Sequence, residues 1–319
     1  MQDFMGELIG FLEDGREEVR LSAATTVAGL TGSVDGIKML LTKSQSLFPV
    51  LLKMLHDQSD KVAEQVYATL VNLSLDEAAC KILLGFGVVE RVMEILRNSR
   101  ANEAGGGGRN VSLTAKLLSN LTLHEDAVDK LLQKGKGPLE GFFVTWIVQA
   151  TVCADVETQN EKEYFAAVLT NISQDEVGRR VLFDSDSANL KVLNGELGKK
   201  NQSALRRESL CKVVRNVFMG CSKDDKVEEV VESGSIDTCV GLLSSCVGKK
   251  EEEQELSVLC RQALLEGVLC LAGEEKSRSV LWKQKVPDIL QKLYEQETNE
   301  QLNEILERCA DVFIEESGM

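Results

Sequence analysis

The sequence contains few prolines, histidines and aromatic residues. Its 319 residues include 3 prolines and 2 histidines, and aromatic side chains make up 5% of the chain. A β-rich protein of this length normally has frequent turn prolines and a larger share of aromatic and β-branched residues. Hydrophobic residues make up 43% and charged residues 27%, which is enough apolar surface for a packed core. The composition therefore predicts a folded, mostly helical protein.

The scarcity of histidine argues against several kinds of chemistry. His56 and His124 stand far apart in the sequence, so neither a histidine-rich metal site nor a multi-histidine acid–base site is expected. No Ser-His-Asp set, HExxH motif, Walker loop or paired catalytic carboxylate stands out. We therefore expect neither an enzyme nor a bound metal or cofactor.

Long apolar runs and paired cysteines are also missing. The longest apolar stretch, Phe142 to Val148, is far shorter than the about 20 residues that cross a bilayer. The acidic N-terminus does not resemble a signal peptide. The 9 cysteines form no CxxC pair and are expected to be reduced, buried side chains. These features predict no membrane contact and a cytoplasmic location.

One motif recurs along the chain. It reads apolar-x-Asn-apolar-Ser/Thr-x-x-Glu, in segments that begin at Thr69, Lys116 and Ala167. The asparagines of this motif are Asn72, Asn120 and Asn171, and a looser copy places Asn216 in the same role. Two weaker copies have Gly29 and Cys270 there. The spacings of about 43 to 54 residues lie in the range of armadillo and HEAT repeats once loops are allowed.

Each copy predicts a sharp corner between two helices. Ser74, Thr122 and Ser173 follow apolar helical runs, and a glutamate follows each of them three residues later, which is the capping-box pattern. Glycines at 85 and 87, at 135 and 137, or at 234 then stop the second helix. A long helix, a capped corner, a shorter helix, a glycine stop and another helix form the armadillo unit.

The repeats predict an all-α fold. We expect an armadillo/HEAT-like right-handed α-solenoid of about six helical repeats, in which stacked units share one core. It forms a single array over residues 1–319, with units near 4–45, 46–98, 110–150, 160–195, 205–245 and 255–316. Two insertions are expected to be a flexible glycine-rich loop at 98–110 and a charged loop at 248–255.

The recurring asparagines are candidate partner-binding residues. On the concave face of a solenoid, Asn72, Asn120, Asn171 and Asn216 would form a ladder, and an asparagine amide can pair with the backbone of an extended peptide. Alternatively, each asparagine bonds to loop backbone at the end of its own helix. Nuclear-import armadillo proteins have a tryptophan four residues before this asparagine, which is missing here. Trp146 and Trp282 lie in other registers and are expected in the core.

Charge is unevenly distributed along the acidic chain. Between Arg179 and Arg215 there are 9 bases and 4 acids, whereas the whole chain has a net charge of −15. From Glu295 to the end there are 8 acids and 1 base. The basic stretch predicts a patch that attracts an acidic partner, with a solvated surface as the alternative. Its candidate residues are Arg179, Arg180, Arg206, Arg207 and Arg215. Because the whole chain is acidic, nucleic-acid binding is not expected.

Three segments resemble one known family. EYFAAVLTNISQDEVGRRVLF at 163–183, with LVNLS at 70–74 and LLSNLT at 117–122, is similar to the N-terminal conserved region of the Hgh family of armadillo-like eukaryotic proteins. RRESLCKVVRNVFMGCSKDD at 206–225 and the segment at 260–298 resemble the start and the end of that family's second region. The two regions correspond to residues 1–195 and 205–319. The acidic stretch between the two parts of the second region is reduced here to KKEEEQE.

This resemblance implies a function. Members are non-enzymatic chaperone adaptors in the cytosol that bind newly made eukaryotic elongation factor 2 and pass it to the cytosolic ring chaperonin, with prefoldin as a further associate. We expect a monomer that binds neither nucleic acid nor membrane. The alternative is a generic armadillo scaffold that binds an extended peptide segment of another protein through its concave groove. The positions that match the family are Tyr164, Asn171, Ser173, Gly178, Arg179, Arg206, Arg207, Arg215 and Asn216, of which Gly178 is expected to be structural.

Overall fold

The computed structural model of the chain describes residues 3–101, 110–152, 156–184, 188–250, 254 and 256–315. Every regular element in these residues is a helix, which confirms the predicted all-α class. The chain divides into two compact parts, the N-terminal part (residues 1–134) and the C-terminal part (residues 135–319). One continuous solenoid over residues 1–319 stays a prediction. Residues 102–109 of the predicted flexible loop, and residues 251–253 and 255 of the charged loop, lie outside the described residues.

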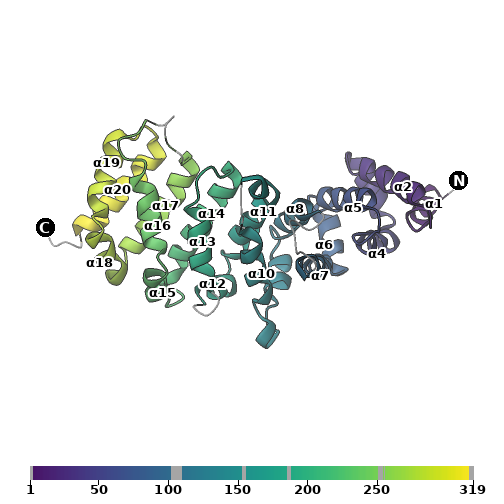
Figure 1. The fold of residues 1–319 in the computed structure, drawn as a ribbon, viewed down its shortest axis with the longest axis horizontal. Helices are drawn as coiled ribbons and strands as arrows, with labels where there is room; N and C mark the ends of the chain where they lie inside the picture. The colour runs from purple at the N-terminus through teal and green to yellow at the C-terminus, as the bar shows by residue number, and fades with distance from the viewer. Residues whose placement is uncertain are drawn as a thin grey trace. The chain divides into compact units, whose positions relative to one another are not determined.

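The N-terminal part begins with a single helix, and sets of three helices follow (Figure 1). Within it, α2 packs against α5 and α5 packs against α8. The helices are α1 (Phe4–Leu12), α2 (Glu17–Leu30), α3 (Val34–Leu41), α4 (Ser44–Met54), α5 (Asp60–Leu73), α6 (Glu77–Gly85), α7 (Val88–Ala101), α8 (Val111–Leu121) and α9 (Glu125–Leu132).

The C-terminal part contains two rows of stacked helices. Its elements are the 3-10 helix η1 (Gly137–Leu139), α10 (Phe142–Thr151), α11 (Val156–Ile172), α12 (Glu176–Phe183), α13 (Asn189–Leu197), α14 (Ala204–Cys221), α15 (Val227–Glu232), α16 (Ser235–Ser244), α17 (Val258–Ala272), α18 (Glu275–Lys283), α19 (Val286–Gln296) and α20 (Glu300–Glu315). In the first row, which we call the long-helix row, α11, α14, α17 and α20 each pack against the next (Figure 1). In the second row, α10, α13, α16 and α19 do the same.

This arrangement is an armadillo-like α-solenoid. Each long helix is followed by a short corner helix and then by a third helix. In the order of the chain, the described residues contain 6 such triplets: α2–α4 and α5–α7 in the N-terminal part, α11–α13, α14–α16 and α17–α19 in the C-terminal part, and α8–α10, whose helices are divided between the two parts. The predicted fold class and repeat number are therefore confirmed. The predicted boundary between residues 45 and 46 is wrong, because it falls inside α4. The first triplet begins at α2, and α1 precedes it.

The corners between helices are built differently from the predicted capping box. The hydroxyl of Ser74 donates to the Val71 carbonyl at 2.6 Å, so it belongs to the end of α5. Asp76 is the N-cap of α6, and its carboxylate accepts the Ala79 N–H at 2.9 Å. Asp175 caps α12 in the same way. At these two corners the hydroxyl residue closes the first helix, and the aspartate two positions later opens the next, whereas His124 stands at this position before α9 and makes no capping bond.

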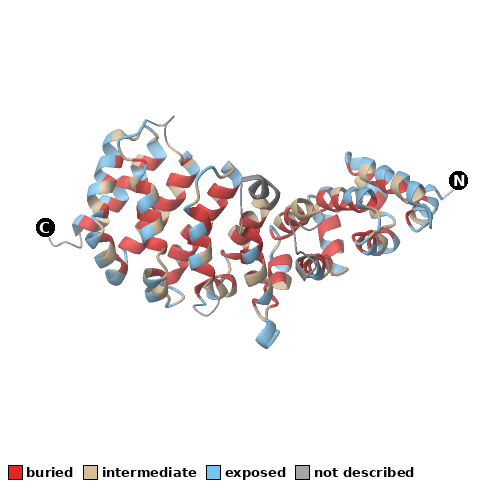
Figure 2. Cartoon of the chain, in the orientation of Figure 1, coloured by how far each residue is buried: buried red, intermediate tan, exposed pale blue. Residues whose placement is uncertain are grey.

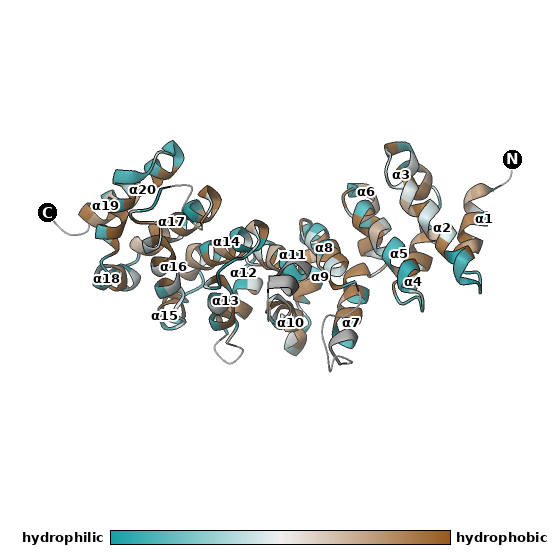
Figure 3. Cartoon of the chain, turned by 45° about the horizontal axis from the view of Figure 1, so that its top comes forward, coloured by the Kyte–Doolittle hydropathy of each residue, from teal (hydrophilic) through white to brown (hydrophobic). Residues whose placement is uncertain are grey.

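Aliphatic residues of the stacked helices make up most of the core. Buried residues are red in Figure 2, and hydrophobic residues are brown in Figure 3. Of the 8 cysteines described, 7 are buried, Cys270 is half-buried, and none forms a disulfide. Burial raises the pKa of the Cys239 thiol to about 12. The expectation of buried cysteines is thus confirmed for these seven positions. No helix in the described residues is both long and apolar enough to span a membrane.

Candidate protein-binding surface

Asn216 connects two neighbouring repeats of the C-terminal part. It lies on α14, and its side-chain amide donates to the Thr170 carbonyl at 3.2 Å and to the Ser173 hydroxyl at 2.9 Å, both at the end of α11. Its amide oxygen accepts from the Arg215 guanidinium at 3.1 Å. Only 7% of the residue is exposed. Asn216 therefore closes the end of the preceding long helix and not of its own.

Asn72 and Asn120 make the same kind of contact in the N-terminal part. The Asn120 amide donates to the Ser74 hydroxyl at 3.1 Å and to the Val71 carbonyl at 3.3 Å. The Asn72 amide donates to the Thr31 hydroxyl at 2.8 Å. Each contact again reaches the end of the preceding long helix. The predicted ladder thus exists as a repeating contact between helices, and peptide binding by it stays a prediction, as it does for Asn171, which also has a partner.

Arg179 connects two successive corners. Its guanidinium forms an ion pair with Asp224, with 2.6 Å between Nε and Oδ2, and a second hydrogen bond of 3.1 Å to Oδ1. A third nitrogen donates to the Gln174 carbonyl at 2.8 Å. The two side chains are 13% and 8% exposed. Because Arg179 lies on α12 and Asp224 follows α14, the pair fixes the spacing between two repeats.

Two of the five predicted patch residues are not on the surface. Arg206 is completely buried, and it donates to the Glu196 carboxylate at 2.7 Å and to the Thr151 carbonyl at 2.6 Å. Arg207 is 5% exposed and donates to the Lys199 carbonyl at 2.8 Å. Their prediction as partner-binding surface residues is therefore wrong. The sequence shows a cluster of charges, but not that Glu196 comes from α13 to neutralise Arg206 inside the core.

Arg180 and Arg215, the remaining two arginines of the predicted patch, each have an acidic neighbour. Arg180 is 53% exposed and forms an ion pair with Glu140. Arg215 is 27% exposed and lies 3.1 Å from the Glu266 carboxylate on α17. Among the five arginines only Arg180 is an exposed side chain, so they do not form a continuous basic patch.

A shallow depression is lined by one residue of the predicted asparagine ladder, Asn216, and one of the predicted basic patch, Arg179. It has a volume of about 220 Å³. Its lining residues come from the end of α11, from α12 and from α14, and they are Ser173, Gln174, Arg179, Asn216, Met219, Gly220 and Lys223. Gly220 is needed for close packing, because a Cβ atom there would lie 2.1 Å from the Arg179 Nε.

Met219 and Lys223 are exposed residues of this depression, as is Gln174. Met219 is 50% exposed, and Lys223 is also exposed at its edge. A flexible apolar side chain beside an ammonium group suits a partner segment that carries one apolar and one acidic residue. Sequence reasoning missed both residues. Met219 lies three positions after Asn216 on α14, hence on the same helix face, and this spacing could have identified it; Lys223 lies in the turn that follows α14.

Gly178 has a structural role, as expected. A Cβ atom at this position would lie 2.0 Å from the Ile172 carbonyl oxygen, so only glycine fits at this corner. In the described part of the chain, no group of three His, Cys, Asp or Glu side chains could hold a metal ion.

The family of the chain follows from comparison with known proteins. A family described as a domain of unknown function, DUF383, matches residues 107–307, which include the depression and most of the C-terminal part. The chain belongs to this family. Its similarity to the Hgh proteins is confirmed as well, because curated relatives in several eukaryotes have the name Protein HGH1 homolog.

Two of these relatives show how far the family similarity extends. The Protein HGH1 homolog of Dictyostelium discoideum is 22% identical, and the alignment covers 98% of this chain and 90% of the relative. The one of Drosophila melanogaster is 25% identical over 91% of this chain and 83% of the relative. Among solved structures, an engineered protein aligns with a TM-score of 0.73 at 17% identity, covering 95% of this chain and 66% of that one. That likeness concerns the fold alone.

Proposed function

We propose that the protein is a non-enzymatic chaperone adaptor of the cytoplasm. It binds newly made eukaryotic elongation factor 2 and passes it to the cytosolic ring chaperonin, with prefoldin as an associate. The observation that carries this proposal is the similarity to Protein HGH1 homologs over 98% of the chain. The client and its hand-over come from the family resemblance of the conserved segments around residues 163–183 and 206–225.

The solenoid supports a protein-binding role. Stacked repeats present long rows of side chains that can contact an extended or partly folded client. The depression that includes Met219 and Lys223 lies at the end of α14, and both residues belong to the family segment at 206–225. Its lysine complements acidic residues of a client, and its methionine adapts to apolar ones.

Pull-down from a eukaryotic lysate tests the proposal. Tagged protein is incubated with translating lysate at low salt, and the bound proteins are quantified by mass spectrometry. We expect elongation factor 2 and chaperonin subunits to be enriched over a tag-only control. If both are absent under gentle salt conditions, the proposed function is wrong.

A pair of matched double variants tests the role of the depression. Met219→Ser with Lys223→Glu changes two exposed residues of the depression, and we expect it to lower the amount of bound elongation factor 2. Leu205→Ser with Lys200→Glu makes the same type of change at exposed positions outside it. Equal binding by both double variants would place the client elsewhere on the protein.

The alternative is a generic armadillo scaffold that binds an extended peptide. The accessible depression on α14 also fits this role, but the asparagine amides that the peptide would need already donate to neighbouring helices. The two functions differ in the client. A scaffold of this kind would retain unrelated extended peptides as strongly as elongation factor 2.

A further inference from the structure

The last three described helices line an apolar groove outside the depression described above. It has a volume of about 470 Å³ and is enclosed by α18, α19 and α20. Trp282, Tyr294 and Ile314 are 44%, 45% and 58% exposed. The expectation that Trp282 belongs to the core is therefore wrong. The apolar lining includes these three residues together with Leu290, Leu306 and Phe313.

The position of the groove in the repeat pattern indicates what fits it. In the preceding layer, α15 is covered by α18, α16 by α19 and α17 by α20. Among the described residues, no further layer covers α18, α19 and α20. In a solenoid each repeat covers an apolar face of its neighbour, and an uncovered apolar face lowers solubility. An apolar face at this position therefore has the form of a receptor for one more helix.

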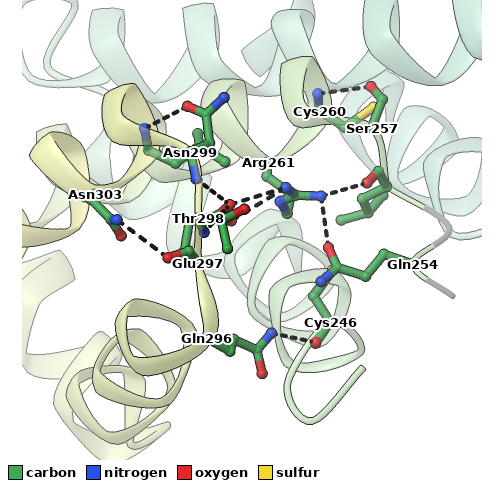
Figure 4. A network of polar contacts seen from close by, with 12 residues as sticks. Cys246, Gln254, Ser257, Cys260, Arg261, Gln296, Glu297, Thr298, Asn299 and Asn303 are labelled. Carbon is green, nitrogen blue, oxygen red and sulfur yellow. Dashed lines mark hydrogen bonds and ion pairs between the residues drawn. The ribbon is translucent and has the colours of Figure 1, made fainter. Parts of the chain in front are cut away.

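A buried polar network fixes the turn between α19 and α20, two of the helices that line the groove (Figure 4). Arg261 of α17 forms an ion pair with Glu297 at 3.2 Å, and the side chains are 3% and 10% exposed. The same carboxylate accepts the backbone N–H groups of Thr298 and Asn299 at 3.1 Å. The turn between α19 and α20 is thereby fixed to α17. The groove is preformed, which lowers the entropic cost of binding.

The charged residues of the groove have one sign. Its titratable acidic side chains are Glu307 and Asp311, and no basic residue lines it. Glu307 accepts a hydrogen bond of 2.8 Å from the Tyr294 hydroxyl, at the rim. The segment from Glu295 to the end of the chain contains 8 acids and 1 base. An occupant must therefore bring positive charge as well as apolar side chains.

We infer that the groove binds an amphipathic, basic helix of a partner protein. Apolar residues of this helix at positions i, i+3, i+4 and i+7 enter the groove, and its lysines and arginines face Glu307 and Asp311. A second copy of the chain fits less well. Its α1 exposes Phe4 and Phe11, but it also carries Glu7, and an acidic helix is repelled by an acidic rim.

A synthetic helix tests this inference on the full-length chain. The probe is a fluorescein-labelled leucine–lysine peptide of about 18 residues, long enough for about five helical turns. Binding is followed by fluorescence anisotropy at about 150 mM salt, where long-range attraction is screened. We expect saturable binding that is much weaker for a leucine–glutamate peptide of the same pattern.

Two variants with matched controls locate the site. Asp311→Lys should weaken binding of the leucine–lysine peptide at least about threefold and strengthen that of the leucine–glutamate peptide. Glu64→Lys makes a comparable charge change on α5 and should have no effect. Ile314→Asn should weaken binding about tenfold, whereas Leu259→Asn, at an exposed position on α17, should not. Thermal unfolding confirms that each variant is folded.

Three results would overturn the inference. The first is no binding of the leucine–lysine peptide, and the second is equal binding of both peptides. The third is a dimer in sedimentation equilibrium that Ile314→Asn dissociates, because the occupant would then be a second copy of the chain.

Discussion

At the level of single residues, the recurring asparagines stabilise contacts between repeats. Asn216 and Asn120 each donate to a hydroxyl and a carbonyl group at the end of the preceding long helix. The sequence allowed the asparagines and hydroxyls to be recognised as one recurring motif. It did not show that Asn120 and Asn216 bond to the hydroxyl of the preceding copy, because that partner lies more than forty residues away.

Replacing Asn216 tests this role. Asn216→Ala leaves the Thr170 carbonyl and the Ser173 hydroxyl without their donor in a buried site, so we expect the free energy of unfolding to fall by about 1–3 kcal/mol. Urea unfolding at neutral pH measures the change. Asn72→Ala is the control, because this asparagine is exposed and its hydrogen bond of 2.8 Å to the Thr31 hydroxyl is accessible to water, so the variant should lose less stability. An unchanged unfolding curve for Asn216→Ala would contradict a structural role.

Arg20 and Asp57 in the N-terminal part repeat the geometry of Arg179 and Asp224. The Arg20 guanidinium donates to both Asp57 oxygens, at 2.7 and 2.9 Å, and its third nitrogen donates to corner carbonyls. Burial alone would raise the pKa of Asp57. Hydrogen bonds from Arg20 and from the Ser59 N–H outweigh it, so the pKa lies below its usual value.

The lowered pKa predicts a pH-dependent stability. The folded state holds the Asp57 proton less tightly than the unfolded state, so the contribution of the ion pair is complete above the unfolded pKa and is lost as the pH falls. We expect Asp57→Asn to lower the free energy of unfolding by about 1–3 kcal/mol at pH 7. The difference from the unmodified protein should shrink as the pH falls from about 5 to about 3.

Urea unfolding across this pH range measures the difference. Asp35→Asn is the control, because the Asp35 side chain is 97% exposed. It should change stability little at any pH. A constant difference for Asp57→Asn down to about pH 3 would show that ionisation of this carboxyl does not stabilise the fold.

At the level of helices, the sequence predicted the corners but not their caps. The hydroxyl after each long helix and the glycine stops marked the helix ends, and Gly87 and Gly234 have positive φ values of +76° and +78° between two helices. The capping-box prediction was wrong because two neighbouring residues can each cap a helix at this corner. Ser74 bonds backward to its own helix, which leaves Asp76 as the cap of the next helix.

The position of α20 depends on the Arg261–Glu297 pair. Glu297→Ala leaves a buried arginine without its carboxylate, so we expect the free energy of unfolding to fall by about 3–5 kcal/mol. Amide hydrogen exchange should accelerate more in α20 than in α11. Combining Arg261→Met with Glu297→Leu should restore much of the stability, because no unpaired charge remains in the core.

The matched control for this prediction is Glu300→Ala, an exposed position at the start of α20. It should leave both stability and exchange nearly unchanged. If Glu297→Ala behaves like this control, the ion pair does not hold α20 against α17.

At the level of the whole molecule, the repeat pattern and the charge could be read from the sequence, but the accessible surface could not. The recurring motif predicted a solenoid, because each repeat must bury one apolar face against the next repeat. The basic stretch between Arg179 and Arg215 appeared continuous, yet Arg206 and Arg207 are buried beside residues from other segments. The apolar groove of α18, α19 and α20 was missed for the same reason, since Trp282 has the pattern of a core residue.

The most direct test of the proposed function is retention of newly made elongation factor 2. Elongation factor 2 is translated with a labelled amino acid in a cell-free eukaryotic system, and the tagged protein is retrieved at successive times. We predict that labelled elongation factor 2 is bound early, that binding declines as the folded form accumulates, and that purified native elongation factor 2 is not retained. No retention at any time, or equal retention of the native form, would contradict a role as its folding adaptor.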